Sequence, residues 1–135
     1  MENGVIARNV RELAVYRLAF KSAMDLFRET ASFPKEEKYS LTDQIRRSSR
    51  SVCSNLAEGW YKRRYYAAFV SKLLDSCQEA SETQTWLEFS LACGYISEGT
   101  FKHFFEQYEH IIAQLLTMEK KAASFCTITP SKTSK

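Results

Sequence analysis

The two histidines are the first residues to consider for chemistry, because imidazole is the side chain that most often binds metals or transfers protons near neutral pH. His103 and His110 lie seven residues apart in a segment with helical periodicity. Seven helical residues separate two side chains by roughly 10 Å along the axis, which is too far for both to bind one metal ion. A di-metal carboxylate bundle would place Glu three residues before each His, whereas this chain has Thr100 and Gln107 there. We therefore predict surface histidines and no metal site.

The other reactive residue types also lack a catalytic arrangement. Glu79 and Glu82 share a helical face, but no third ligand accompanies them. The serines and cysteines show no nucleophile-elbow or catalytic-cysteine motif, and no glycine-rich phosphate loop is present. The sequence therefore predicts no enzyme, no cofactor and no small-molecule substrate. An ordered metal, or carboxylates with shifted pKa values in a cleft, would favour an enzyme again.

Two basic features are candidates for binding. Three arginines fall on the side of a helix opposite its apolar seam, and residues 60–66 read Trp-Tyr-Lys-Arg-Arg-Tyr-Tyr. Cations neutralise phosphates, and aromatic rings stack on unpaired bases. The candidate nucleic-acid-binding residues are therefore Arg46, Arg47, Arg50, Trp60, Lys62, Arg63 and Arg64. An alternative stays open, in which the aromatic side chains plug the end of a helical bundle and the cations keep that end soluble.

Charge is distributed unevenly along the chain. The net charge of +3 is too small to indicate a nucleic-acid partner by itself. Residues 1–74 carry 14 Lys and Arg against 8 Asp and Glu, residues 75–119 carry 1 against 8, and residues 120–135 carry 4 Lys and no acid. A protein with a basic half and an acidic half could neutralise itself internally or stack on copies of itself, and both possibilities stay open.

Length and composition favour one all-α domain. A chain of 135 residues can bury a substantial core, and its 4 Gly and 2 Pro leave little material for many turns. The four cysteines form no CxxC pair, which predicts a reduced, cytoplasmic protein. The start of the chain has no apolar run of signal-peptide length, and no stretch of about 18 apolar residues predicts a membrane span.

Helical periodicity divides the chain into four segments. Apolar residues recur at three- and four-residue steps over residues 12–31, 40–59, 65–93 and 98–123. Pro34, Gly59 and Gly94 lie where these segments end. Four helices with short connections predict an antiparallel up-and-down four-helix bundle. Residues 124–135 are mostly Ser, Thr, Lys and Pro, so we expect a disordered tail.

The segment 40–59 organises the predicted bundle. Its core seam is Leu41, Ile45, Val52 and Leu56, which lie close to whole helical turns apart. Ser48, Ser49 and Ser51 are poor helix formers, and we interpret them as small residues that allow a neighbouring helix to approach closely.

Several polar and apolar positions outside the expected core are candidates for an oligomer interface. In the segment 12–31, the expected core stripe is Leu13, Tyr16, Phe20, Ala23, Met24 and Phe27, and a second apolar patch includes Val15, Leu18 and Leu26. Trp86 lies among acidic residues, where a large ring indicates an interface. The candidate interface residues are Val15, Leu18, Leu26, Gln44, Ser51, Glu58, Glu79, Glu82 and Trp86.

Long parts of the chain resemble a known bacterial family. The residues that carry the likeness are Leu13 to Thr30, the run LTDQIRRSSRSVCSNLAEG and Gly94-Tyr95-Ile96, and its most specific parts are 44–47 and 55–59. They are similar to the four-helix-bundle proteins called 23S rRNA intervening-sequence proteins or S23 ribosomal proteins, over about residues 11 to 122. The resemblance implies a homopentamer with no established catalytic activity. Similar pentameric bundles are accessory proteins of diversity-generating retroelements, where a reverse transcriptase and nucleic acid are their partners.

We therefore expect a non-enzymatic homo-oligomer that binds RNA or a nucleoprotein through its basic and aromatic residues. The alternative is a protein–protein interaction scaffold, or an accessory subunit of a protein such as a reverse transcriptase, with no direct binding to nucleic acid. In that case the arginines belong to contacts between subunits.

Overall fold

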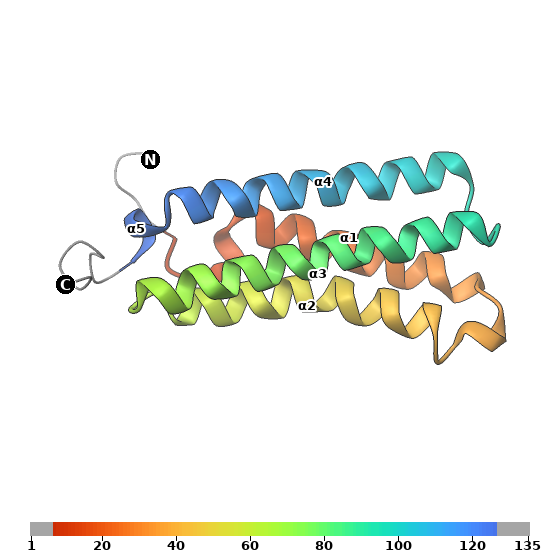
Figure 1. The fold of residues 1–135 in the computed structure, drawn as a ribbon, viewed down its shortest axis with the longest axis horizontal. Helices are drawn as coiled ribbons and strands as arrows, with labels where there is room; N and C mark the ends of the chain where they lie inside the picture. The colour runs from red at the N-terminus through yellow and green to blue at the C-terminus, as the bar shows by residue number, and fades with distance from the viewer. Residues whose placement is uncertain (1–6, 127–135) are drawn as a thin grey trace.

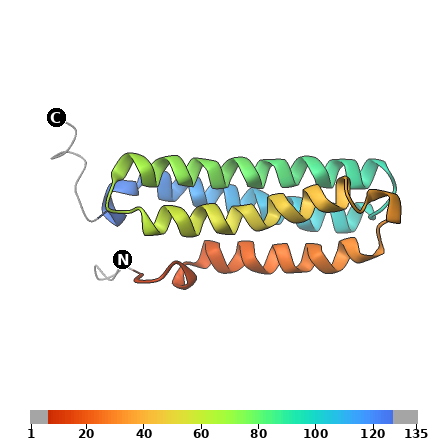
Figure 2. The ribbon, with the colours of Figure 1, turned by 90° about the horizontal axis from the view of Figure 1, so that it is seen from below.

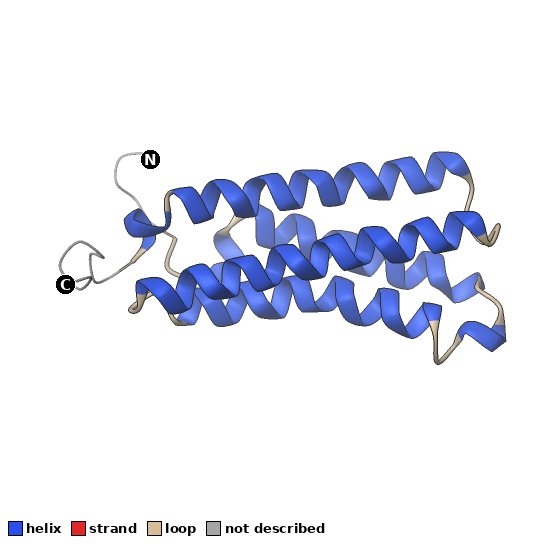
Figure 3. Cartoon of the chain, viewed as in Figure 1, coloured by secondary structure: helices blue, strands red, loops and turns tan. Residues whose placement is uncertain are grey.

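The computed structural model of the chain describes residues 7–126, which form four long helices. They are α1 (Ala14–Glu29), α2 (Leu41–Tyr61), α3 (Tyr66–Ala92) and α4 (Glu98–Lys120), and a short helix α5 (Ala122–Phe125) follows. Successive long helices run in opposite directions, so both ends of the described chain lie at one end of the bundle (Figure 1, Figure 2). The described residues contain no strand (Figure 3). The predicted all-α four-helix bundle is confirmed.

The helix ends follow most of the predicted stop and start signals. α1 passes through a single 3-10 turn before Pro34, and Gly94 adopts a φ of 80° just after α3, a conformation that glycine favours. Ser97 precedes α4, and its Oγ accepts a hydrogen bond of 3.0 Å from the Thr100 amide. No helix within residues 7–126 is both long and apolar enough to cross a membrane.

The glycine residue type had suggested that α2 ends at Gly59. This prediction is wrong, because the helix continues to Tyr61. A Cβ atom on Gly59 would lie 2.9 Å from the Cβ of Lys72 and 3.7 Å from the ring of Phe69. These two residues belong to α3, so the missing side chain allows α2 and α3 to approach closely. The glycine is needed for packing between helices rather than for a turn.

The hydrophobic core lies mainly between α2 and α3, and α4 packs over it. The predicted seam of α2 is confirmed, because all four of its residues are at most 8% exposed. Other fully buried side chains are Phe69, Leu73 and Leu87 of α3 and Tyr108, Ile111 and Leu115 of α4. Each large apolar side chain buried in this way contributes about 1.5–3 kcal/mol to stability.

Small polar residues link α2 to α3 inside the core. The Oγ of Ser48 and the Oγ1 of Thr83 lie 2.7 Å apart, and the Oγ of Ser76 donates a hydrogen bond of 2.7 Å to the carbonyl of Val52. Ser48 and Ser49 are buried, so the prediction that the serines serve close packing is confirmed for these two, whereas Ser51 is half-buried and lines a groove. The hydrogen bonds satisfy hydroxyl groups that would otherwise be costly to bury.

α1 turns the opposite face to the core from the one predicted. Val15 and Leu26 are 4% and 1% exposed, whereas Phe20, Met24 and Phe27 are 52%, 36% and 40% exposed. The prediction is wrong for Phe20, Met24 and Phe27, whereas Ala23 is buried as predicted and Leu13 and Tyr16 are half-buried against the core. Both faces of this helix are apolar, and periodicity alone cannot tell which of two apolar faces is buried. Val15 and Leu26 are core residues of the subunit and are therefore removed from the candidate interface.

The beginning of the predicted disordered tail is ordered. Phe125 lies in α5, with its ring centroid 5.7 Å from that of Trp60 and 6.2 Å from that of Phe69. The expectation of disorder is therefore wrong for residues 124–126. Residues 127–135 lie outside the described residues.

Candidate nucleic-acid and subunit interfaces

The connection between α2 and α3 lies at the end of the bundle where the described chain begins and ends (Figure 1). The Nη1 of Arg63 donates a hydrogen bond of 3.5 Å to the carbonyl of Ala7, and the rings of Trp60 and Phe125 are in contact. These contacts bring three distant segments together. Their exposed cations are Arg8, Lys62, Arg64, Lys120 and Lys121, which we call the basic end. None of the five forms an ion pair with another residue of the described range.

Trp60 and Arg63 pack against other residues of the subunit at this end of the bundle. Trp60 is 5% exposed and packs edge-on against Phe69 at 6.2 Å between ring centroids. The guanidinium carbon of Arg63 lies 3.9 Å from the centroid of the Trp60 indole, and its Nε donates a hydrogen bond of 2.9 Å to the Trp60 carbonyl. Burial lowers the pKa of Arg63 from its usual value. The alternative interpretation, that this segment closes the bundle, is therefore correct for these two residues.

The three tyrosines of the same segment remain exposed, Tyr66 the least of them at 38%. Tyr61 and Tyr65 are 90% and 60% exposed, and the guanidinium of Arg64 lies 5.9 Å from the centroid of the Tyr65 ring. Both of these tyrosines belong to the segment 60–66 that was predicted to bind, but neither was named among the individual binding residues. Because successive helical residues point about 100° apart, Tyr61 faces outward when its neighbour Trp60 faces the core. That difference depends on the register of α2 beyond Gly59, where the sequence had suggested that the helix ended.

The three arginines of α2 have different surroundings. Arg46 binds α1: its Nε donates to Thr30 Oγ1 at 2.8 Å, its Nη2 donates to the Phe27 carbonyl at 3.0 Å, and its guanidinium lies 4.5 Å from the Phe27 ring centroid. The prediction that Arg46 projects outward is therefore wrong. Arg47 and Arg50 are exposed, and Arg47 makes only a 3.9 Å contact with Asp43.

The two predicted basic features are separate surfaces. Arg50 and Lys62 are twelve residues apart in sequence, which corresponds to roughly 18 Å along α2. One surface is the basic end, and the other is a ridge in the middle of α2. A ligand that covers both would have to be extended along the bundle.

A polar groove between α2 and α3 brings together several predicted interface residues. Its volume is about 450 Å³, and it is lined by Gln44, Arg47, Ser48, Arg50, Ser51, Glu79 and Glu82. Burial, followed by the nearby charges of Glu82 and Asp75, raises the pKa of Glu79. Neither Glu79 nor Glu82 forms an ion pair within residues 7–126. The groove therefore has a carboxylate with a shifted pKa, but no histidine or activated hydroxyl lines it.

An apolar groove lies on the other side of α2, against α1. Its volume is about 510 Å³, and its α1 wall consists of Tyr16, Phe20, Ala23 and Met24. Arg11, Arg50 and Glu58 also line it, and the guanidinium of Arg11 lies 5.6 Å from the centroid of the Tyr16 ring. This is the face of α1 that the sequence had assigned to the core. The exposed apolar area is of the kind that marks protein–protein contacts.

The remaining predicted interface residues are dispersed. Leu18 is half-buried against the core, and Glu58 is paired with Lys72. Trp86 is half-buried next to Phe89, which is 54% exposed and whose ring centroid lies 6.0 Å from that of Trp86. Sequence reasoning had missed Phe89, although a second ring three residues from Trp86 was a signal for an apolar patch.

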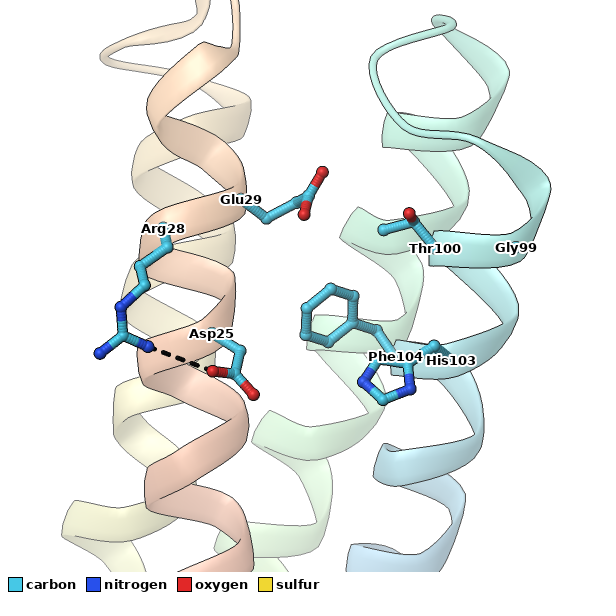
Figure 4. A pocket seen from close by; sticks show the side chains of 7 residues that line it. All are labelled: Asp25, Arg28, Glu29, Gly99, Thr100, His103 and Phe104. Carbon is cyan, nitrogen blue, oxygen red and sulfur yellow. Dashed lines mark hydrogen bonds and ion pairs between the residues drawn. The ribbon is translucent and has the colours of Figure 1, made fainter.

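A third cleft, between α1 and α4, contains one of the two histidines (Figure 4). Its volume is about 490 Å³, and Glu29 and His103 point toward each other's helix across it. Asp25 is held by Lys21 and Arg28, at 2.8 Å and 3.1 Å. Within residues 7–126, no group of three His, Cys, Asp or Glu side chains could hold a metal ion. Thr100 and His103 both line the cleft, but the hydroxyl of Thr100 is hydrogen-bonded to Ser97 and no hydrogen bond joins it to His103 within the described residues.

Cys53 and Cys77 are not activated nucleophiles. Burial raises the pKa of Cys53 to about 11, and burial together with the charge of Glu119 raises the pKa of Cys77 to about 11. Both thiols are therefore protonated at neutral pH, whereas a reactive cysteine needs a lowered pKa.

Comparison with known proteins identifies the family. The sequence model of the 23S rRNA-intervening sequence proteins matches residues 11–117. Among solved structures, the chain is similar to a protein of unknown function from the S23 ribosomal protein family of Bacteroides thetaiotaomicron, with a TM-score of 0.70 and 23% identity, over 79% of this chain and 99% of that one. At this identity the likeness shows the fold alone. Comparison with curated proteins gave no match. Because the family model covers most of the chain, the protein belongs to the 23S rRNA-intervening sequence protein family.

Proposed function

We propose that the protein is a non-enzymatic homo-oligomer that binds RNA through its basic end. The observation that carries this proposal is the convergence of five exposed cations, from three segments, that have no acidic partner among the described residues. Exposed cations that form no ion pair within residues 7–126 are free to neutralise phosphates, and each such contact releases a counterion. The description of the family, which names an rRNA insertion, is consistent with an RNA partner.

The proposed assembly is the homopentamer that the resemblance implies. A ring needs two different faces on each subunit, because each copy contacts its neighbours head to tail. The chain offers such a pair: the apolar groove of α1 and α2, with Arg11 and Arg50 beside it, and the acidic row of α3 that contains Glu79 and Glu82. In a ring the basic ends of the subunits would lie side by side, which multiplies their attraction for phosphate.

The test is a titration of labelled, structured RNA at about 50 and about 200 mM salt. The parent should bind at low salt and lose affinity steeply at high salt. Lys62→Glu combined with Arg64→Glu should weaken binding strongly and reduce the salt dependence. The matched control is Lys35→Glu combined with Lys38→Glu, which makes the same charge change at the opposite end of the bundle and should have a much smaller effect. Absence of binding at low salt, or equal losses in both variants, would contradict the proposal.

A second candidate function is a protein-interaction scaffold or an accessory subunit, for example of a reverse transcriptase, without direct binding to RNA. It is favoured by the unpaired carboxylates of Glu79 and Glu82, which could accept arginines of a neighbouring chain. Glu79→Gln combined with Glu82→Gln should then reduce the molar mass measured by light scattering. In that case, addition of RNA should leave the molar mass of the parent unchanged.

A further inference from the structure

We infer that the basic end binds unpaired nucleotides by stacking on Tyr61 and Tyr65, and that it does so without preference for sequence. This inference rests on the proposed RNA binding and names the form of RNA that the site accepts. It begins with the separation of the aromatic side chains at this end into two groups. Trp60, Phe69 and Phe125 pack against one another inside the bundle, whereas Tyr61 and Tyr65 are 90% and 60% exposed.

The exposed rings stand among cations. Lys62 and Arg64 lie between the two tyrosines along the turn, and Lys120 and Lys121 lie where α4 finishes, at the same end of the bundle (Figure 1). The turn itself is held rigidly, since Tyr65 donates a backbone hydrogen bond of 2.9 Å to the carbonyl of Lys62, and Arg63 fastens the turn to Trp60 and Ala7. A rigid platform of rings with cations around it can bind a base and its flanking phosphates together.

The exposed tyrosine rings cannot stack on the faces of paired bases. In a duplex the faces of the bases are covered by their neighbours, and in A-form RNA the major groove is too deep and narrow for side chains to read. A ring that is 90% exposed at the tip of a helical bundle, such as that of Tyr61, can stack only on a base that is not covered in this way. Duplex RNA would meet the cations alone.

The same turn has no amide or carboxylate side chain with which to distinguish one base from another. Residues 60–66 contain no Asn, Gln, Asp or Glu, which are the usual amide and carboxylate partners of base edges. Arg63 is engaged by Trp60, and Arg64 lies against Tyr65. Stacking and phosphate contacts accept any base, so binding should depend on strandedness and not on sequence.

The experiment compares three ligands of about 15 nucleotides, a length within the range that one such platform covers. They are a fluorescein-labelled oligouridine, a duplex RNA of mixed sequence, and an abasic oligonucleotide that keeps the phosphates. Anisotropy at low salt should show oligouridine bound about tenfold or more tightly than either of the others. A single strand of mixed sequence that forms no hairpin should bind like oligouridine.

The tyrosine variants separate stacking from charge. Tyr61→Ala combined with Tyr65→Ala should weaken binding of oligouridine by about tenfold or more and leave the affinity for duplex and abasic ligands unchanged. Tyr61→Phe combined with Tyr65→Phe should keep the parent affinity, because the ring and not the hydroxyl stacks. Tyr39→Ala is the matched control, since Tyr39 is 84% exposed beside Lys38 at the opposite end of the bundle and should have no effect.

The outcomes distinguish this inference from the proposed function. Equal affinity for single-stranded and duplex RNA, with no effect of the alanine variants, would overturn stacking while RNA binding stands. Loss of binding in the phenylalanine variants would also overturn it, because the hydroxyls would then be the essential groups. No binding of any ligand at low salt would instead overturn the proposed function itself.

Discussion

The ammonium of Lys72 lies 2.7 Å from the Oε1 of Glu58, and it donates a second hydrogen bond, of 2.9 Å, to the Oδ1 of Asn55. The stem of the same lysine passes the position where Gly59 lacks a side chain. Lys72 of α3 thus explains three residues of the run Asn-Leu-Ala-Glu-Gly. Asn55 accepts its hydrogen bond, Glu58 supplies the opposite charge, and Gly59 leaves room for its stem. This run is one of the most specific parts of the family resemblance, and within the subunit it holds α2 against α3.

Replacement of Gly59 by alanine should destabilise the protein. The new Cβ would lie 2.9 Å from the Cβ of Lys72, so α2 and α3 would have to move apart. Overpacking of this kind costs about 1–3 kcal/mol, which thermal or urea unfolding would measure. Gly99→Ala is the control: it lies within α4 with only Ser97 Oγ near the new Cβ, at 3.9 Å, so a helical alanine there should leave stability unchanged or raise it. Equal stability of Gly59→Ala and the parent would show that the two helices do not need this contact.

Replacement of Lys72 by methionine should lower the free energy of unfolding by an amount that depends on pH. The hydrogen bond and charge of Lys72 lower the pKa of Glu58 from 4.5, and the hydrogen bond from Glu58 raises the pKa of Lys72 from 10.5. The stabilisation from Glu58 is therefore fully present above pH 4.5 and is lost as pH falls through its lowered pKa. The stabilisation from Lys72 is fully present below pH 10.5 and is lost as pH rises through its raised pKa.

The difference in free energy of unfolding between the parent and Lys72→Met should consequently be largest near neutral pH and shrink in acid. Urea unfolding at about pH 7 and about pH 3 would measure it. The control is Lys21→Met. This change breaks an exposed ion pair between Lys21 and Asp25, which both lie on α1, and it should change the free energy of unfolding little. A difference that stays constant with pH would mean that Lys72 contributes only through the packing of its stem.

The fold could be predicted from sequence because α2 and α4 each have one dominant apolar face. Ile45, Val52 and Leu56 repeat at helical spacing and are all fully buried. α1 could not be oriented in the same way, since Val15 and Leu26 on one face and Phe20 and Met24 on the other are equally apolar. Which of them is buried depends on the neighbouring helices, and periodicity contains no information about those.

The candidate site was predicted only in part, for a related reason. Lys62 and Arg64 were found from their residue types, but Arg8, Lys120 and Lys121 come from segments that only the fold brings beside them. Trp60 and Tyr61 are neighbours of similar chemistry, and the last turn of α2 decides which one is buried. That turn exists because Gly59 is helical in this structure.

Replacement of Arg46 by lysine should lower stability without affecting RNA binding. The guanidinium makes hydrogen bonds to Thr30 and Phe27 from two different nitrogen atoms, and an ammonium cannot reproduce this geometry. The loss should be about 1–2 kcal/mol in the free energy of unfolding. Arg47→Lys, one residue along the chain, should be neutral because Arg47 is exposed. A strong loss of RNA affinity in Arg46→Lys with unchanged stability would return Arg46 to the binding surface.

Replacement of Phe20 by glutamate should dissociate the proposed oligomer while each subunit keeps its fold. Phe20 is 52% exposed on α1, so a charge there would stay in water in the single subunit but would be buried without a partner in an assembly through the apolar groove. Light scattering should then give the mass of a single chain, and circular dichroism should give an unchanged helical content. Tyr39→Glu is the control, because Tyr39 is also exposed, at 84%, but does not line the groove. An oligomer that survives Phe20→Glu would exclude this face of α1 from the contact between subunits.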